Sequence, residues 1–147
     1  FKDLGFSVLR FNFRSVGRSQ GQFEDGPGEL SDATIALDWL QNMNPDAKQC
    51  WIAGYSFGAW IGLQLLMRRP DINNFIAVSP PANEKDFSFL APCPASGLIV
   101  QGGKDEIVGR LISFSGRTNL GISDFPVAAS DSLAGAVSFC TLSTLLA

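Results

Sequence analysis

The chain has 147 residues, of which 46% are apolar and 17% are charged, and its formal net charge is −3. This composition excludes a disordered chain, and the negative charge offers neither a nucleic acid nor an anionic membrane a basic surface to bind. The length is that of one domain or of a part of a larger one.

The beginning of the chain predicts a strand, a loop and a helix. Residues 6–13 are rich in aromatic and β-branched side chains, which favours a strand. A polar, glycine-rich loop follows, up to residue 28. Residues 29–43 carry apolar side chains at helical spacing, and the pair Asn44-Pro45 ends this helix.

The next segments predict a parallel sheet. We expect strands at residues 49–53, 75–78 and 97–101, and a nearly all-apolar helix at residues 57–69. The strands are continuously apolar rather than alternating, which is typical of strands that are covered on both faces. The predicted fold class is therefore α/β, a parallel sheet with helices on both faces.

The composition changes after about Val108. Residues 109–147 are rich in Ser, Gly, Ala and Leu, contain four charged residues and keep no helical or strand period for long. Their uncharged end, residues 132–147, is too short and too rich in Ser and Thr for a membrane span. We therefore divide the chain into a predicted core, residues 1–108, and an anomalous tail, residues 109–147, which we expect to be irregular with few contacts to the sheet.

The cysteines give no sign of a disulfide framework or a zinc site. Cys50, Cys93 and Cys140 are odd in number, widely spaced and never in a Cys-x-x-Cys pair. Buried free thiols fit a cytoplasmic protein. Because the chain has no histidine and no cysteine cluster, we predict neither a metal nor another cofactor.

The strongest motif lies at residues 50–58, which read Cys-Trp-Ile-Ala-Gly-Tyr-Ser-Phe-Gly. A short apolar strand runs into Gly-x-Ser-x-Gly and then into an apolar helix, which is the sequence form of a nucleophile elbow. It predicts that Ser56 lies at the tip of a tight turn with a positive φ. The amide of Phe57 then lies at a helix N-terminus, where backbone donors and the helix dipole can stabilise an oxyanion. The alternative is that Ser56 is a structural serine in a strand–helix turn.

The same pattern occurs a second time, around Ser19 in residues 17–21. No apolar strand comes immediately before this match and no helix follows it directly. We interpret Ser19 as a loop residue with a structural role or a place on the rim of a substrate site.

A candidate acid, Asp105, follows the last predicted strand. The carboxyl ends of parallel strands are where functional loops gather, and an acid after the nucleophile fits the chain order Ser…Asp…His. The alternative is that Asp105 is a surface residue of a turn. Glu106 is its competitor, and Asp71 and Asp86 are less well placed.

Three runs, residues 11–21, 54–59 and 102–105, together resemble the α/β-hydrolase superfamily. The closest group is that of small bacterial-type hydrolases related to dienelactone hydrolases and Xaa-Pro dipeptidyl-peptidase-like domains, and the resemblance covers roughly residues 1–108. It implies that Ser56 is the nucleophile, that Asp105 is the acid and that the Phe57 amide is an oxyanion donor. It also implies a small-molecule acyl substrate, such as an ester, a thioester or a peptide-like group.

Two elements of that family are missing from the sequence. The early strands and a His-Gly-type loop should precede Phe1, and a catalytic histidine should follow Asp105, but the chain contains no histidine. A serine nucleophile of this type needs an imidazole to take its proton. We therefore expect a fragment of a hydrolase with impaired activity, and a frameshift after about Val108 would account for the tail.

Two other functions remain open. The chain could be a non-catalytic binding module that retains the hydrolase fold. It could also be a structural or oligomerisation element that associates through exposed sheet edges. The retained elbow argues against the binding module, because a strained turn has no use without chemistry.

Overall fold

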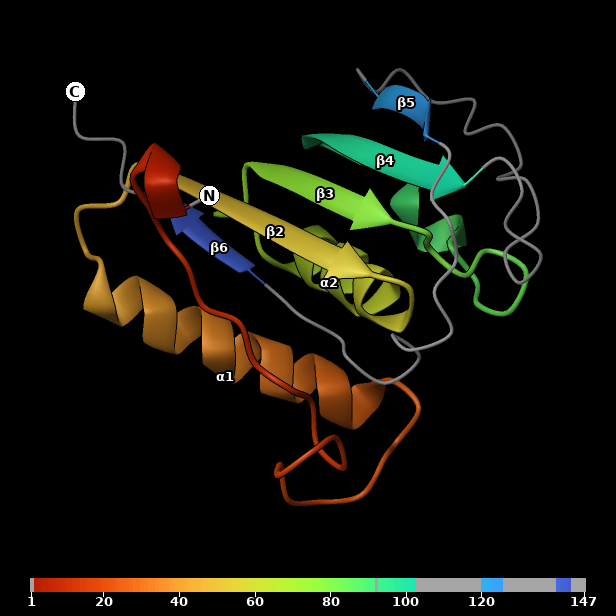
Figure 1. The fold of residues 1–147 in the computed structure, drawn as a ribbon, viewed down its shortest axis with the longest axis horizontal. Helices are drawn as coiled ribbons and strands as arrows, with labels where there is room; N and C mark the ends of the chain where they lie inside the picture. The colour runs from red at the N-terminus through yellow and green to blue at the C-terminus, as the bar shows by residue number, and fades with distance from the viewer. Residues whose placement is uncertain (1, 92, 103–119, 126–139, 144–147) are drawn as a thin grey trace.

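The computed structural model describes residues 2–91, 93–102, 120–125 and 140–143, and it has an α/β fold (Figure 1). In chain order, the elements are η1 (Lys2–Leu4), β1 (Phe6–Ser7), α1 (Pro27–Met43), β2 (Gln49–Tyr55), α2 (Phe57–Arg68), β3 (Asn74–Val78), η2 (Ser88–Leu90), β4 (Ser96–Gly102), β5 (Leu120–Phe125) and β6 (Cys140–Ser143).

The sheet has the strand order β1-β6-β2-β3-β4-β5. Strands β2, β3, β4 and β5 are parallel, whereas β6 runs antiparallel to both β1 and β2. The arrows of β2, β3 and β4 point the same way in Figure 1, so their carboxyl ends meet at one edge of the sheet. The parallel sheet expected from the apolar segments is confirmed.

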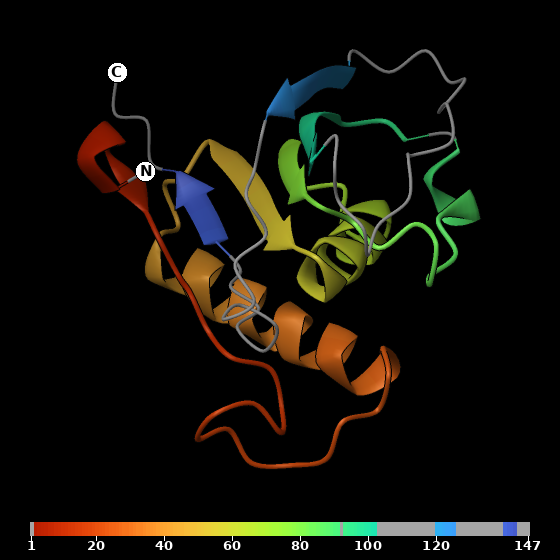
Figure 2. The same ribbon diagram turned by 45° about the vertical axis from the view of Figure 1, so that its right-hand side comes forward.

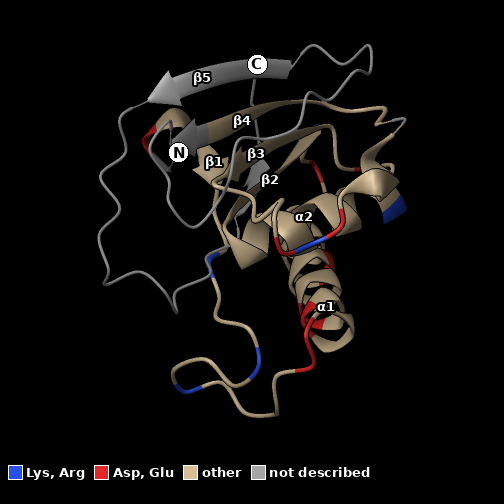
Figure 3. Ribbon diagram, turned by 90° about the vertical axis from the view of Figure 1, so that its right-hand side faces the viewer, with Lys and Arg blue, Asp and Glu red and all other residues tan. Residues whose placement is uncertain are grey.

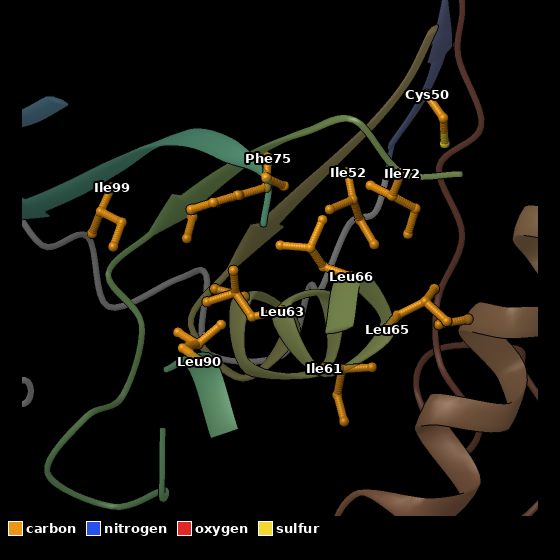
Figure 4. Packing of buried hydrophobic residues seen from close by; sticks show 14 of the residues in the cluster. Cys50, Ile52, Ile61, Leu63, Leu65, Leu66, Ile72, Phe75, Leu90 and Ile99 are labelled. Carbon is orange, nitrogen blue, oxygen red and sulfur yellow. The ribbon is translucent and has the colours of Figure 1, made fainter. Parts of the chain in front are cut away.

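The core lies between the sheet and α2. Ile61, Leu63 and Leu66 of α2 are at most 3% exposed, and Leu63 and Leu66 point toward the strands, where Phe75 lies (Figure 4). Each large aliphatic side chain buried in this way stabilises the fold by about 1.5–3 kcal/mol. Figure 2 shows α1 and α2 on the same side of the sheet, and α1 packs on α2 rather than on the strands.

Both ends of α1 are held by side chains. The helix begins at Pro27, two residues before the predicted start, and ends at Met43 as predicted. The buried carboxylate of Glu29 accepts the backbone N–H groups of Gly26 at 2.8 Å and Glu24 at 2.9 Å, so it satisfies donors at the helix start. Acidic residues lie on α1, among other places, and basic residues lie on the segment before it (Figure 3).

The first predicted strand is much shorter than expected. Residues 6–13 favoured a strand, but only Phe6 and Ser7 form one, and residues 8–13 are not part of the sheet. The last residue of this segment is buried in another way. Phe13 is 1% exposed, and its ring meets those of Phe11 and Phe57 edge to face. The aromatic residues of this segment therefore reflect burial in the core and not pairing in the sheet.

The segment 109–147 contributes two strands to the sheet. Strand β5 pairs with β4 from Gly97↔Leu120 to Gly102↔Phe125, and β6 lies between β1 and β2. The expectation of few contacts with the sheet is wrong for these two strands, because the free backbone groups of an edge strand accept a partner whatever its side-chain period. The division of the chain at residue 108 stays a prediction.

Among the residues that the structure describes, no helix is long and apolar enough to cross a membrane.

Candidate active site

Ser56 occupies a strained turn between β2 and α2. Strand β2 ends at Tyr55, α2 begins at Phe57, and Ser56 between them has φ 50° and ψ −122°. A residue with a Cβ rarely adopts a positive φ, and such strain costs about 1–3 kcal/mol. The turn and the positive φ predicted for Ser56 are confirmed.

The glycines of the motif allow the helix to pass close to the strand. A Cβ on Gly54 would lie 2.4 Å from the carbonyl oxygen of Gly58 and 2.6 Å from the backbone nitrogen of Ala59. Gly54 is therefore required by the close approach of β2 to the first turn of α2. This is the physical reason for the first glycine of Gly-x-Ser-x-Gly.

Backbone hydrogen bonds fix two neighbouring turns at the carboxyl edge of the sheet. The N–H of Ser56 donates to the carbonyl of Val78 at 2.8 Å, and the N–H of Ser79 donates to the carbonyl of Val100 at 2.8 Å. Ser56 and Ser79 each follow a strand, and each is thereby tied to the neighbouring strand near its carboxyl end. Ser79 also has a positive φ, 45°, and is buried. The sequence indicated only that a strand ended near Ser79.

The backbone of Phe57 lies where an oxyanion donor is expected. Phe57 is the first residue of α2, and the amides of a first helical turn have no acceptor within the helix. The helix dipole adds positive potential at this position. The geometry therefore offers a backbone donor beside Ser56.

The side chain of Phe57 belongs to an aromatic cluster that consists of Phe23, Phe57 and Trp60. The ring centroid of Phe57 lies 5.5 Å from that of Phe23 and 5.6 Å from that of Trp60. Phe23 comes from the loop before α1, whereas Phe57 and Trp60 come from the first turn of α2. The predicted loop thus reaches the elbow, a contact that no sequence pattern indicated.

Lys85 joins this cluster from a third segment, after β3. Its ammonium lies 4.8 Å from the ring centroid of Trp60 and 5.7 Å from that of Phe57, and it forms an ion pair with Asp25. The indole N–H of Trp60 donates to the backbone carbonyl of Asp86 at 3.0 Å. The segments that contain Asp25 and Lys85 therefore meet beside the N-terminus of α2.

Arg14 anchors the loop that carries Phe23. Its guanidinium donates to both carboxylate oxygens of Asp32, at 2.8 and 3.1 Å, and also pairs with Glu24. The hydrogen bonds between the two side chains hold the pKa of Asp32 below its usual range. They also raise the pKa of Arg14 above its ordinary value. A charged, hydrogen-bonded pair of this kind orients the backbone on both sides of it.

The remaining sequence candidates are placed as follows. Ser19 lies in a loop, as interpreted, and its hydroxyl donates to the carbonyl of Asn12 at 3.0 Å. Asp71 follows α2, near the beginning of β3 and thus at the opposite edge of the sheet from Ser56, where it pairs with Arg69. Asp86 accepts hydrogen bonds from the backbone N–H and the hydroxyl of Ser88, and the backbone bond is the main reason that its pKa is lowered.

Asp105 and Glu106 lie outside the described residues, so the place of the candidate acid stays a prediction. Within the described ranges, no group of three or more His, Cys, Asp or Glu side chains could hold a metal ion.

A serine on a sharp turn between a parallel strand and a buried helix, at the carboxyl edge of the sheet, defines the α/β-hydrolase fold. Comparison with known families agrees with this class. The model of the X-Pro dipeptidyl-peptidase (S15) family matches residues 1–107, and the chain belongs to this family.

Individual relatives are similar over the same region. An uncharacterised protein of Rickettsia prowazekii (strain Madrid E) is 61% identical over 109 residues, which are 72% of this chain and 46% of that protein. A crystal structure of a protein of unknown function from Agrobacterium tumefaciens, named as a candidate alpha/beta hydrolase, is 64% identical. It has a TM-score of 0.66 and covers 68% of this chain and 46% of its own.

A third relative is an alpha-beta serine hydrolase homologue from Coxiella burnetii. It is 31% identical with a TM-score of 0.61, and the match covers 76% of this chain and 57% of that structure. The chain therefore spans about half the length of the relatives that it matches.

Proposed function

We propose that the protein is a serine hydrolase of the α/β-hydrolase type that acts on an ester, a thioester or a peptide-like acyl group. The observation that carries this proposal is the positive φ of Ser56 between β2 and α2. A strained, half-buried serine at a helix N-terminus is the arrangement that presents a nucleophile to a substrate carbonyl. The family of dipeptidyl-peptidases and the serine hydrolase homologue support the same chemistry.

In the proposed reaction, the Ser56 hydroxyl oxygen attacks the carbonyl carbon of the substrate and forms an acyl-enzyme. The amide of Phe57 stabilises the negative oxygen of the tetrahedral intermediate. The proton of Ser56 passes to an imidazole that Asp105 orients, and the imidazole then protonates the leaving group. Water hydrolyses the acyl-enzyme in a second step with the same acid–base group.

The chain itself has no histidine, so this proton transfer lacks its usual base. Loss of the base from a triad of this kind lowers the rate by about 10⁶-fold. We therefore expect little or no turnover from the chain alone. Free imidazole in the buffer is small enough to take the place of the missing side chain and should restore part of the rate.

The experiment compares the protein with Ser56→Ala on a short-chain nitrophenyl ester at rising imidazole concentrations. Imidazole also cleaves such esters in solution, so the difference between the two proteins is the quantity of interest. We expect this difference to grow and then saturate with imidazole, and mass spectrometry should find the acyl group on Ser56. An identical rate for both proteins at every imidazole concentration would contradict the proposal.

The second candidate is a non-catalytic binding module, which the absence of histidine favours. In that case, substrate analogues bind beside Ser56, but no acyl group transfers to Ser56 at any imidazole concentration. We place the protein in the cytoplasm with a small-molecule acyl substrate as its partner. We propose neither a nucleic acid nor a membrane as a partner. Self-association through exposed sheet edges is a third candidate function, which a measurement of the molecular mass in solution would test.

A further inference from the structure

We propose that the aromatic cluster recognises an uncharged aromatic group of the substrate, and that Phe23 is the residue that determines this preference. This inference rests on the proposed hydrolase function, because it assigns the cluster to the same site as Ser56. The position of Phe23, the charge around the cluster and the way in which its loop is held support the inference.

Phe23 is the open member of the cluster. It is 56% exposed, whereas Phe57 and Trp60 are partly buried and pack against the core. Its ring is tilted by 54° to that of Phe57, the residue that directly follows Ser56. Through this contact, Phe23 is joined to the residue next to the proposed nucleophile. Aromatic rings favour such tilted or offset neighbours.

Other exposed apolar side chains lack this relationship. Ile35, Trp39 and Met43 are 54–65% exposed, but they lie on α1 at intervals of four residues, which is one face of that helix. Exposure alone therefore does not single out Phe23, and its ring contact with Phe57 does.

The charge near the cluster is balanced. The ammonium of Lys85 lies against the rings of Trp60 and Phe57, and the carboxylate of Asp25 pairs with it. The cation is thus engaged by two rings and one carboxylate, which leaves little attraction for an anionic substrate. This balance favours a substrate group without charge.

The loop is held in place directly after Phe23. Directly after Phe23, the N–H of Glu24 donates to the buried carboxylate of Glu29, and the carboxylate of Glu24 pairs with Arg14. Gly26 is bound to Glu29 in the same way, at 2.8 Å. A recognition residue on a fixed loop binds its ligand without a large loss of conformational entropy. The loop is therefore suited to recognition although it has no regular secondary structure.

The test measures binding rather than turnover, so it does not depend on an imidazole. The probe is N-phenylacetamide, an uncharged amide with the shape of a phenyl ester, and its affinity is measured by ligand-observed NMR on the whole chain. N-methylacetamide is the matched probe without a ring. Because a ligand of this size binds weakly, we expect a dissociation constant on the order of millimolar.

The variants isolate the contribution of Phe23. We expect Phe23→Ala to weaken binding of N-phenylacetamide by about fivefold, the size of one aromatic contact. The affinity of Phe23→Leu for N-phenylacetamide should lie between those of the original protein and Phe23→Ala. Trp39→Ala is the control, because it removes an aromatic residue of almost equal exposure, 54%, from another surface. Circular dichroism checks that each variant is folded.

Three results would overturn the inference. These are equal affinity for the two amides, equal affinity of the protein and Phe23→Ala, and an affinity for the anion 4-acetamidobenzoate far above that for N-phenylacetamide. Ser56→Ala should still bind N-phenylacetamide. If binding depends on Phe23 but acyl transfer to Ser56 never occurs, the recognition surface stands and the hydrolase proposal fails. If acyl transfer occurs and Phe23→Ala has no effect, only this inference fails.

Discussion

Gly54 and Gly58 pass so close to each other in the elbow that a Cβ on Gly54 would lie 2.4 Å from the carbonyl oxygen of Gly58. Real Cβ atoms essentially never approach backbone so closely. The contact lies between a central strand and the start of a buried helix, where neither backbone can move without disturbing the core.

Gly54→Ala should therefore destabilise the protein by about 3 kcal/mol or prevent folding, because the added methyl group forces β2 and α2 apart. Urea unfolding followed by circular dichroism measures the change. Ser31→Ala, at an exposed position of α1, is the control and should change the free energy of unfolding by less than about 0.5 kcal/mol. An alanine variant as stable as the original protein would show that the close approach is not required.

Replacement of Ser56 separates strain from chemistry. Ser56→Gly should raise the free energy of unfolding by about 1 kcal/mol relative to Ser56→Ala, because glycine adopts a positive φ without strain and alanine does not. Both variants should lose the imidazole-dependent ester cleavage. Thermal and urea unfolding of the two variants decide the first point. Equal stability would indicate that the turn is not strained.

The pair of Arg14 and Asp32 predicts a loss of stability in acid. The pKa of Asp32 in the folded protein lies below its unfolded value of about 3.9, mainly because of the hydrogen bonds from Arg14. Its contribution is therefore present above pH 4 and is lost as the pH falls through the folded pKa. Urea unfolding at several pH values should show a smaller loss in acid for Asp32→Asn than for the original protein.

Arg14→Gln provides the companion variant for this experiment. It removes the group that lowers the pKa of Asp32, so it should flatten the acid dependence in the same way. The double variant should change little beyond either single one, because the two residues act as one pair. Fully additive effects of the two substitutions would show that Asp32 owes its acid dependence to another group.

Cys50 should resist alkylation in the folded protein. Its side chain is 3% exposed, and burial raises the pKa of the thiol to about 12. Iodoacetamide near pH 8 should therefore label the partly exposed Cys93 and leave Cys50 unmodified until denaturant is added. Peptide mass spectrometry measures both sites. Equal labelling of the two cysteines without denaturant would contradict the burial of Cys50.

The same thiol affects stability in base. Because its folded pKa lies above the unfolded value of about 8.5, its contribution is complete below pH 8.5 and declines as the pH rises toward 12. Cys50→Ser would remove this dependence, although its own cost in packing must be measured at pH 7 first.

Local patterns in the sequence were sufficient for the elbow and for the elements around it. The apolar strand, the glycine spacing and the apolar helix around Ser56 predicted the turn and its positive φ, because all three signals come from residues that are neighbours in the chain. The ends of α1 were predicted to within two residues, since Asn44-Pro45 and the helical period are also local signals.

Tertiary structure decided the surroundings of Ser56. Asp25 and Lys85 are 60 residues apart in the chain and meet only because two loops reach the same end of α2. Phe23 has no period or motif to mark it, and its contact with Phe57 depends on how Arg14 and Glu29 hold the loop. Strand pairing behaved in the same way. The composition of residues 8–13 favoured a strand, but these residues are not part of the sheet. Strands β5 and β6 pair with the sheet although their sequences show no strand period. The reason is that a strand forms only where a neighbouring strand offers free backbone groups.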